Sequence, residues 1–163
     1  MEASKASTGN LPVELQPTSV LELLNQAVEE YRERLEAGKL EIVMALRGDL
    51  TVQADGKHMW RILDNLLNNV VKYALPGTRV YVTAEKRNEW VVIAVKNISR
   101  DPLNVSADEL MERFVRGDVS RNTEGSGLGL NIAKSLIELQ RGQLRLLVDG
   151  DLFKTSMIFP TAD

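Results

Sequence analysis

Apolar side chains recur at the spacing of an amphipathic helix in three stretches of the chain. The first stretch follows a capping pair, Ser19 with Glu22, and should end near Gly38. The second follows Asp55 and stops before Pro76, and the third continues to about residue 139. The apolar positions that define these three predicted helices are Val20, Leu24, Ala27, Val28, Tyr31 and Leu35; Met59, Ile62, Leu63, Leu66, Leu67 and Val70; and Leu128, Ile132, Leu136 and Leu139.

Other stretches alternate between apolar and polar residues, as strands do. We expect strands at 40–44 and 51–53 and two hairpins, 79–86 with 90–96 and 143–148 with 152–159. Ser106 with Glu109 forms a second capping pair, which predicts a short helix to about Arg113. The polar stretch 116–126 shows no periodicity and should be a loop.

The order of these elements predicts an α/β (α+β) two-layer sandwich. Its sheet would be mixed but mostly antiparallel, with about five strands, and three helices would cover one face. The other face of the sheet would stay open or meet a partner. Residues 18–160 would form this domain, preceded by a polar linker at 1–17 and followed by a short tail at 161–163.

Composition narrows the classes of function. A net charge of −3 over 163 residues argues against a protein that coats nucleic acid, so nucleic acid is not expected among its partners. The absence of cysteine excludes a disulfide framework and a thiolate zinc site. No apolar run approaches the roughly 20 residues of a spanning helix, and no apolar stretch follows Met1 as in a signal peptide.

Three alternating glycines stand where the third helix begins. A helix N-terminus presents unpaired N–H groups, and glycines let the backbone approach an anion closely. This stretch therefore suggests a phosphate site, although a flexible hinge before a helix would look the same. Its residues are Gly125, Ser126, Gly127, Leu128, Gly129 and Leu130.

One face of the second helix carries a second candidate for phosphate chemistry. Asn65 and Asn69 are four residues apart, and Lys72 lies three residues further on, so the three side chains share a side of the helix. An asparagine carbonyl suits Mg²⁺, and a lysine offsets phosphate charge. A solvated polar face is the plain alternative. Tyr73 and Tyr81 are aromatic candidates for contact with a base, whereas His58 is interpreted as a structural residue.

Three segments together resemble the conserved boxes of sensor histidine kinases, in the order of that family. Residues 64–73 resemble the N box, 112–118 the F box and 125–130 the G2 box. The resemblance covers residues 18–160 and implies the Bergerat fold of the GHKL ATPases, with ATP between helices and sheet under a lid.

The resemblance also implies roles for the candidate residues. Asn69 would bind Mg²⁺, Asn65 and Lys72 would lie on the phosphate side, and Tyr73 would lie against adenine. Phe114 and Arg116 would organise the lid. The glycine-rich segment would wrap the triphosphate, with N–H groups from Gly127 to Leu130 as donors; its residues are Gly125, Ser126, Gly127, Leu128, Gly129 and Leu130.

The G1 box departs from the family pattern. The family places there an aspartate that accepts from the adenine amino group, followed by spaced glycines. Here Asn97 holds that position and the glycines are absent. An asparagine carbonyl still accepts, but without charge assistance, so adenine binding would be weaker or differently posed. Asp101 is a rival acceptor.

The family's phosphoacceptor histidine is not recognisable, since His58 lies inside the N-box helix. We therefore expect that residue on upstream dimerisation helices, of which 1–17 would be a remnant and linker. The resemblance implies an ATP-dependent histidine kinase domain that cooperates with those helices and with a response regulator. The domain would be monomeric and cytoplasmic, and the full-length bacterial protein dimeric and membrane-anchored. A GHKL serine kinase of the anti-sigma type, with Asp64 as base, and a non-catalytic docking module are the alternatives.

Overall fold

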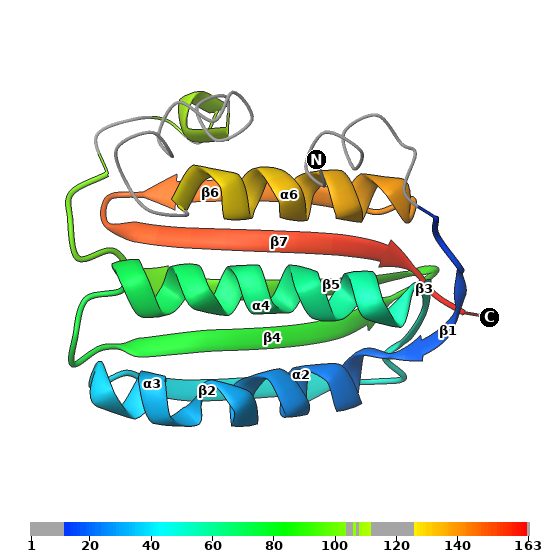
Figure 1. Cartoon of the computed structure of the whole chain (residues 1–163), viewed down its shortest axis with the longest axis horizontal. Helices are drawn as coiled ribbons and strands as arrows, with labels where there is room; N and C mark the ends of the chain where they lie inside the picture. The colour runs from blue at the N-terminus through cyan, green and yellow to red at the C-terminus, as the bar shows by residue number, and fades with distance from the viewer. Residues whose placement is uncertain (1–11, 104–105, 107, 112–125, 163) are drawn as a thin grey trace.

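The protein forms two layers, a twisted sheet and a layer of helices on one of its faces (Figure 1). The computed structural model describes residues 12–103, 106, 108–111 and 126–162, with only the backbone for 126–129. The main sheet has five strands in the order β2-β4-β5-β7-β6. They are β2 (Glu41–Arg47), β4 (Arg79–Arg87), β5 (Trp90–Ile98), β6 (Gln143–Asp149) and β7 (Leu152–Pro160).

Strand pairing matches the mixed sheet predicted from the sequence. β2 and β4 run parallel, and the other three neighbouring pairs are antiparallel. The two hairpins turn through two-residue loops whose first residues, Asn88 and Gly150, have φ of 58° and 62°. Hairpin turns of two residues need this left-handed conformation, which glycine adopts freely and asparagine tolerates.

Three helical segments lie side by side across the same sheet face in Figure 1. They are α2 (Val20–Glu30) with α3 (Arg32–Ala37), α4 (Gly56–Tyr73) and α6 (Ser126–Leu139). The first segment was predicted as one helix, but it divides at Tyr31. The Tyr31 hydroxyl donates a 2.6 Å hydrogen bond to Asp64 Oδ1 on α4, so this boundary residue joins two helices.

Side-chain caps fix where two helices begin. Ser19 Oγ accepts from Glu22 N–H at 3.2 Å, as the capping pair predicted. Asp55 Oδ1 accepts from Lys57 and His58 N–H at 3.0 and 3.3 Å at the start of α4. Fixing the start of α4 also fixes its rotation, and thereby which side chains face the sheet.

The core lies between the helices and the sheet. The buried side chains of α4, β4, β5 and β7 recur among partly buried ones at the helical and strand periods predicted from the sequence. They include Met59, Ile62, Leu63, Leu66, Val80, Val82, Ala84, Val91, Ile93, Val95, Met157 and Phe159.

A second, two-stranded sheet pairs β1 (Gln16–Ser19) with β3 (Thr51–Ala54). Sequence analysis placed Gln16 and Pro17 in a linker, whereas the structure places them in β1. None of the helices in the described part of the chain has the length and apolarity of a membrane-spanning segment.

Candidate functional site

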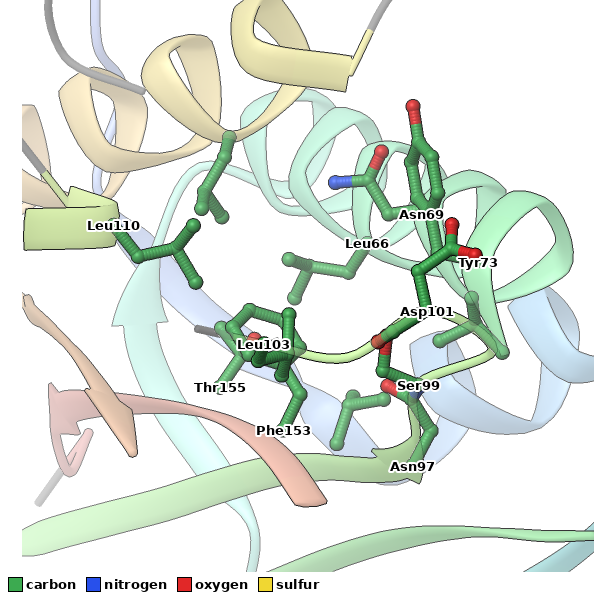
Figure 2. Close-up of a pocket in the computed structure, with 13 residues that line it drawn as sticks. Leu66, Asn69, Tyr73, Asn97, Ser99, Asp101, Leu103, Leu110, Phe153 and Thr155 are labelled. Atoms are coloured by element: carbon green, nitrogen blue, oxygen red, sulfur yellow. The ribbon is translucent and has the colours of Figure 1, made fainter. Parts of the chain in front are cut away.

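A cavity of about 190 Å³ lies between α4 and the strands β5 and β7, beside the first turns of α6 (Figure 2). Apolar side chains form much of its wall, and polar side chains from α4, from β5 and the segment after it, and from β7 face it. The described lining residues are Leu66, Asn69, Val70, Tyr73, Val95, Asn97, Ser99, Asp101, Leu103, Leu110, Leu130, Phe153 and Thr155.

Helix α4 contributes one face to this cavity. Leu66, Asn69, Val70 and Tyr73 are spaced by three, four and seven residues, which places them on one side of the helix. Leu66 and Val70 are buried, whereas Asn69 brings a polar amide to the same face. Helix α4 therefore brings both an apolar wall and a polar amide to the cavity.

Strand β5 contributes the side opposite α4. Val95, Asn97 and Ser99 alternate along the chain and so point to the helix side of the sheet. On β7, Thr155 pairs with Val95 and Phe153 pairs with Asn97. The Asn97 amide thus has an aromatic side chain directly across the strand pair.

The segment after β5 is tied to the end of α4 by backbone hydrogen bonds. Leu75 N–H donates to Ile98 O at 2.8 Å, and Arg100 N–H donates to Tyr73 O at 2.8 Å. The Ser99 hydroxyl donates to Asp101 O at 2.7 Å. These bonds hold Tyr73 and the Ser99–Asp101 turn in fixed positions at one end of the cavity.

Several polar groups of the cavity have no internal partner. The Tyr73 hydroxyl oxygen is buried without a hydrogen bond to any described residue. The side chains of Asn97 and Thr155 make no hydrogen bond to the described residues, although these residues are only 6% and 3% exposed. A buried polar group without a partner is costly, so the Tyr73 hydroxyl favours a polar ligand in the cavity.

Four of the predicted site residues line the cavity, namely Asn69, Tyr73, Asn97 and Leu130. Asn65 and Lys72 lie on α4 but outside the described lining. Ser126, Gly127, Leu128 and Gly129 form the start of α6. Phe114, Arg116 and Gly125 lie outside the described residues.

Two sequence interpretations change at this point. Tyr81, on β4, does not line the cavity. Its ring instead lies against Lys96 of β5, whose ammonium is 5.0 Å from the ring centroid. Asp64 is also outside the described lining, and its carboxylate accepts the Tyr31 hydroxyl at 2.6 Å. Burial and this hydrogen bond raise the pKa of Tyr31 well above its usual range. A carboxylate held in this contact is poorly placed as the base of a serine kinase.

Sequence reasoning missed other members of the lining, namely Leu66, Val70, Val95, Ser99, Leu103, Leu110, Phe153 and Thr155. The alternation of β5 could have indicated Ser99, since it shares a face with Asn97. No local signal indicates Phe153 or Thr155, because their place beside β5 depends on the pairing of strands far apart in the sequence.

The fold thus combines a helix-covered mixed sheet with a cavity between α4 and the strands β5 and β7. The chain belongs to the family of histidine kinase-, DNA gyrase B- and HSP90-like ATPases, whose family model matches residues 54–159. The predicted recognition and fold are thereby confirmed.

Its relatives include sensor proteins of bacteria. It is 29% identical over 142 residues to the alginate biosynthesis sensor protein KinB of Pseudomonas aeruginosa, covering 86% of this chain and 24% of that protein. It is 28% identical over 145 residues to the signal transduction histidine-protein kinase BaeS of Escherichia coli, covering 88% and 31%. The chain thus spans about a quarter to a third of the length of these relatives.

Solved structures share the fold at low sequence identity. The histidine kinase AdeS of Acinetobacter baumannii superposes with a TM-score of 0.80 at 16% identity, over 99% of this chain and 74% of that one. The catalytic domain of the histidine kinase ThkA gives 0.79 at 21% identity, over 91% and 96%.

Proposed function

We propose that this chain is the catalytic ATP-binding domain of a sensor histidine kinase. It would bind Mg²⁺-ATP and donate the γ-phosphoryl group to a histidine on a dimerisation helix of the same kinase. The observation that carries the proposal is the cavity itself, where the buried Tyr73 hydroxyl has no described partner and where Asn97 and Thr155 add two polar side chains to the lining.

The size and walls of the cavity suit the base of the nucleotide. At about 190 Å³ it is smaller than the roughly 300–1,000 Å³ of sites that enclose a whole drug-sized ligand. A planar base would fill the space among Val70, Val95 and Phe153, with its polar edge toward Asn97 and Thr155. The phosphates would then extend along Asn69 toward α6.

The phosphate side offers ligands of the right chemistry. The Asn69 carbonyl suits Mg²⁺, which prefers hard oxygen ligands and shares phosphate oxygens. Lys72, one turn further along α4, carries a positive charge, and the backbone N–H groups at the start of α6 favour anions. Bound Mg²⁺ would neutralise charge on the transferred group.

The residues of this domain would position the phosphates of ATP and stabilise the transition state, but they would not themselves react. Transfer breaks the bond from the γ-phosphorus to the bridging oxygen and forms one to the histidine nitrogen, through a loose transition state. Asn69, Lys72 and the α6 N–H groups would hold the phosphates in line and offset their charge. The nucleophile would come from another segment of the kinase.

Two related structures support the proposed ligands and partners. ShkA has been solved full-length in complex with AMPPNP, and ThkA in complex with the response regulator protein TrrA. By analogy, this domain would work with a response regulator within a membrane-anchored, dimeric kinase whose kinase domain is cytoplasmic. The residues that precede β1 would connect it to the dimerisation helices.

Calorimetric titration with a non-hydrolysable ATP analogue, with and without Mg²⁺, tests the proposal. We expect Mg²⁺-dependent binding that Asn69→Ala weakens by about tenfold to a hundredfold, through loss of one charge-assisted ligand. Asn68→Ala is the matched control, because Asn68 is the preceding residue of α4 and lies outside the described lining. No binding under any condition would indicate the docking module instead.

A further inference from the structure

We infer that the base site accepts 6-oxopurine nucleotides, such as inosine triphosphate, as well as 6-aminopurine nucleotides. The residue that determines this breadth is Asn97. The inference rests on the proposed nucleotide-binding function and concerns which purine the same cavity takes.

Asn97 is placed to contact the polar edge of a base. It lies on β5 on the helix side of the sheet, opposite Phe153 on β7, and lines the cavity (Figure 2). The residue is 6% exposed, so little bulk water reaches it. Its backbone is held by strand pairing, while its side chain makes no hydrogen bond to the described residues that would fix the orientation of the amide.

A side-chain amide that is free to rotate can form hydrogen bonds with either kind of purine. Its carbonyl accepts and its NH₂ donates, and a half-turn about the last side-chain bond exchanges the two. The adenine edge offers a donor at the 6-amino group and an acceptor at N1. The hypoxanthine edge offers an acceptor at O6 and a donor at N1–H. The two orientations of Asn97 match the two edges equally well.

A carboxylate at this position would behave differently. An ionised carboxylate only accepts hydrogen bonds, so it pairs with a 6-amino group and repels a 6-oxo group. Sites whose buried groups have a single polarity reject a mismatched ligand strongly, because the mismatch leaves polar groups unpaired. Asn97 can turn and so avoids that mismatch.

The side chains of Thr155, Ser99 and Asp101 add little discrimination between the two purines. The Thr155 hydroxyl both donates and accepts, and it has no described partner that would orient it. The Ser99 hydroxyl donates its proton to Asp101 O and leaves only a neutral oxygen facing the cavity. Asp101 is the one carboxylate in the described lining, and it is exposed, so water can satisfy it whichever purine is bound.

The test measures the dissociation constants of ATP and inosine triphosphate by displacement of a fluorescent ATP analogue in the presence of Mg²⁺. These ligands share the ribose and triphosphate and differ only on the six-membered ring of the base. In the wild-type protein we expect the two constants to agree within about tenfold. In Asn97→Asp we expect ATP to be favoured by at least about tenfold more than in the wild type, since the acceptor is now charged.

Two further variants separate the alternatives. Asn25→Asp adds the same charge on an exposed position of α2 and should leave the ratio of the two constants unchanged. Asp101→Asn tests whether the Asp101 carboxylate, rather than Asn97, determines which purine is bound. The ratio of the ATP and inosine triphosphate dissociation constants in the wild-type protein tests the inference even if Asn97→Asp does not fold.

The outcomes are distinct. Similar constants for the two nucleotides support the inference. A wild-type preference for ATP of a hundredfold or more overturns it while leaving the proposed function intact, and loss of that preference in Asp101→Asn would assign the reading to Asp101. Failure of both nucleotides to bind would overturn the proposed function and the inference together.

Discussion

Gly142 lies where the chain leaves α6 for β6, closer to a neighbouring strand than a side chain allows. A Cβ added there would stand 2.8 Å from Ile158 O and 2.8 Å from the Phe159 ring. Both neighbours belong to β7, and Phe159 is fully buried. The backbone of β7 cannot withdraw without disturbing its pairing with β5, so this position requires glycine for space rather than for φ.

Gly142→Ala should therefore destabilise the fold. We expect the free energy of unfolding to fall by about 1–3 kcal/mol, the usual cost of overpacking, measured by urea denaturation. Gly56→Ala is the matched control, because a Cβ there meets nothing within 4 Å at the first position of α4. That change should be neutral or slightly stabilising. Equal losses in the two variants would contradict the steric explanation.

At the scale of elements, the start of α4 gathers contacts from three parts of the chain. Asp55 caps the helix through the Lys57 and His58 N–H groups, and its other carboxylate oxygen accepts from Glu14 N–H at 2.9 Å. The Asp55 N–H donates to Gln140 Oε1 at 2.7 Å, at the end of α6. Gln140 is fully buried, so the ends of α4 and α6 are joined inside the protein.

The protonation of Asp55 should therefore couple to stability. Burial raises the pKa of its carboxyl, but the backbone N–H groups of Glu14, His58 and Lys57 and the nearby His58 ring lower it by more, so the pKa is below the ordinary 3.8. The ionised Asp55 carboxylate therefore stabilises the fold fully at pH values above its ordinary pKa. This stabilisation is lost as pH falls through the lower pKa of Asp55 in the folded state.

Asp55→Asn tests this coupling, because asparagine keeps a capping oxygen and cannot ionise. We expect the wild type to exceed Asp55→Asn in stability at pH 7, with the difference shrinking as pH falls below about 4. Thermal unfolding of the two proteins over a pH series measures the difference at pH 7 and its decrease at low pH. A difference that stays constant with pH would show that the charge of Asp55 contributes nothing.

For the whole molecule, the only histidine of the chain is far from the proposed phosphate site. His58 and Asn69 lie on the same helix, eleven residues apart, which corresponds to about 16 Å along the axis. His58 Nε2 is also held 2.9 Å from Pro12 O. His58 is thus interpreted as structural, and this distance agrees with that prediction.

Incubation with ATP labelled in the γ-phosphate should accordingly leave this chain unlabelled. Adding separate dimerisation helices that carry the acceptor histidine of the same kinase should give labelled helices, because in the proposed function the domain supplies position and charge and the helices supply the nucleophile. His58→Gln should transfer as the wild type does. Label on the chain that disappears in His58→Gln would show that the acceptor lies within this domain.

Patterns of neighbouring residues predicted most of the elements correctly. The apolar stripe from Met59 to Val70 and the cap at Asp55 fixed α4, and the alternation in β5 with its turn at Asn88 fixed a hairpin. Local patterns also indicated Asn69 and Tyr73, whereas Asn97 entered the candidate site only through the resemblance to the G1 box. They misjudged Tyr31, which interrupts the first helix, and Gln16 and Pro17, which pair with β3, because both outcomes depend on distant partners.

Local sequence patterns were enough to predict the periodic elements, their caps and turns, and candidate residues on single elements, because helix and strand periods act between near neighbours. The folded chain was needed to place β2 parallel to β4, Phe153 and Thr155 beside β5, and Asp64 in contact with Tyr31. These depend on contacts between distant segments, which form when apolar faces are buried together and which no local pattern encodes.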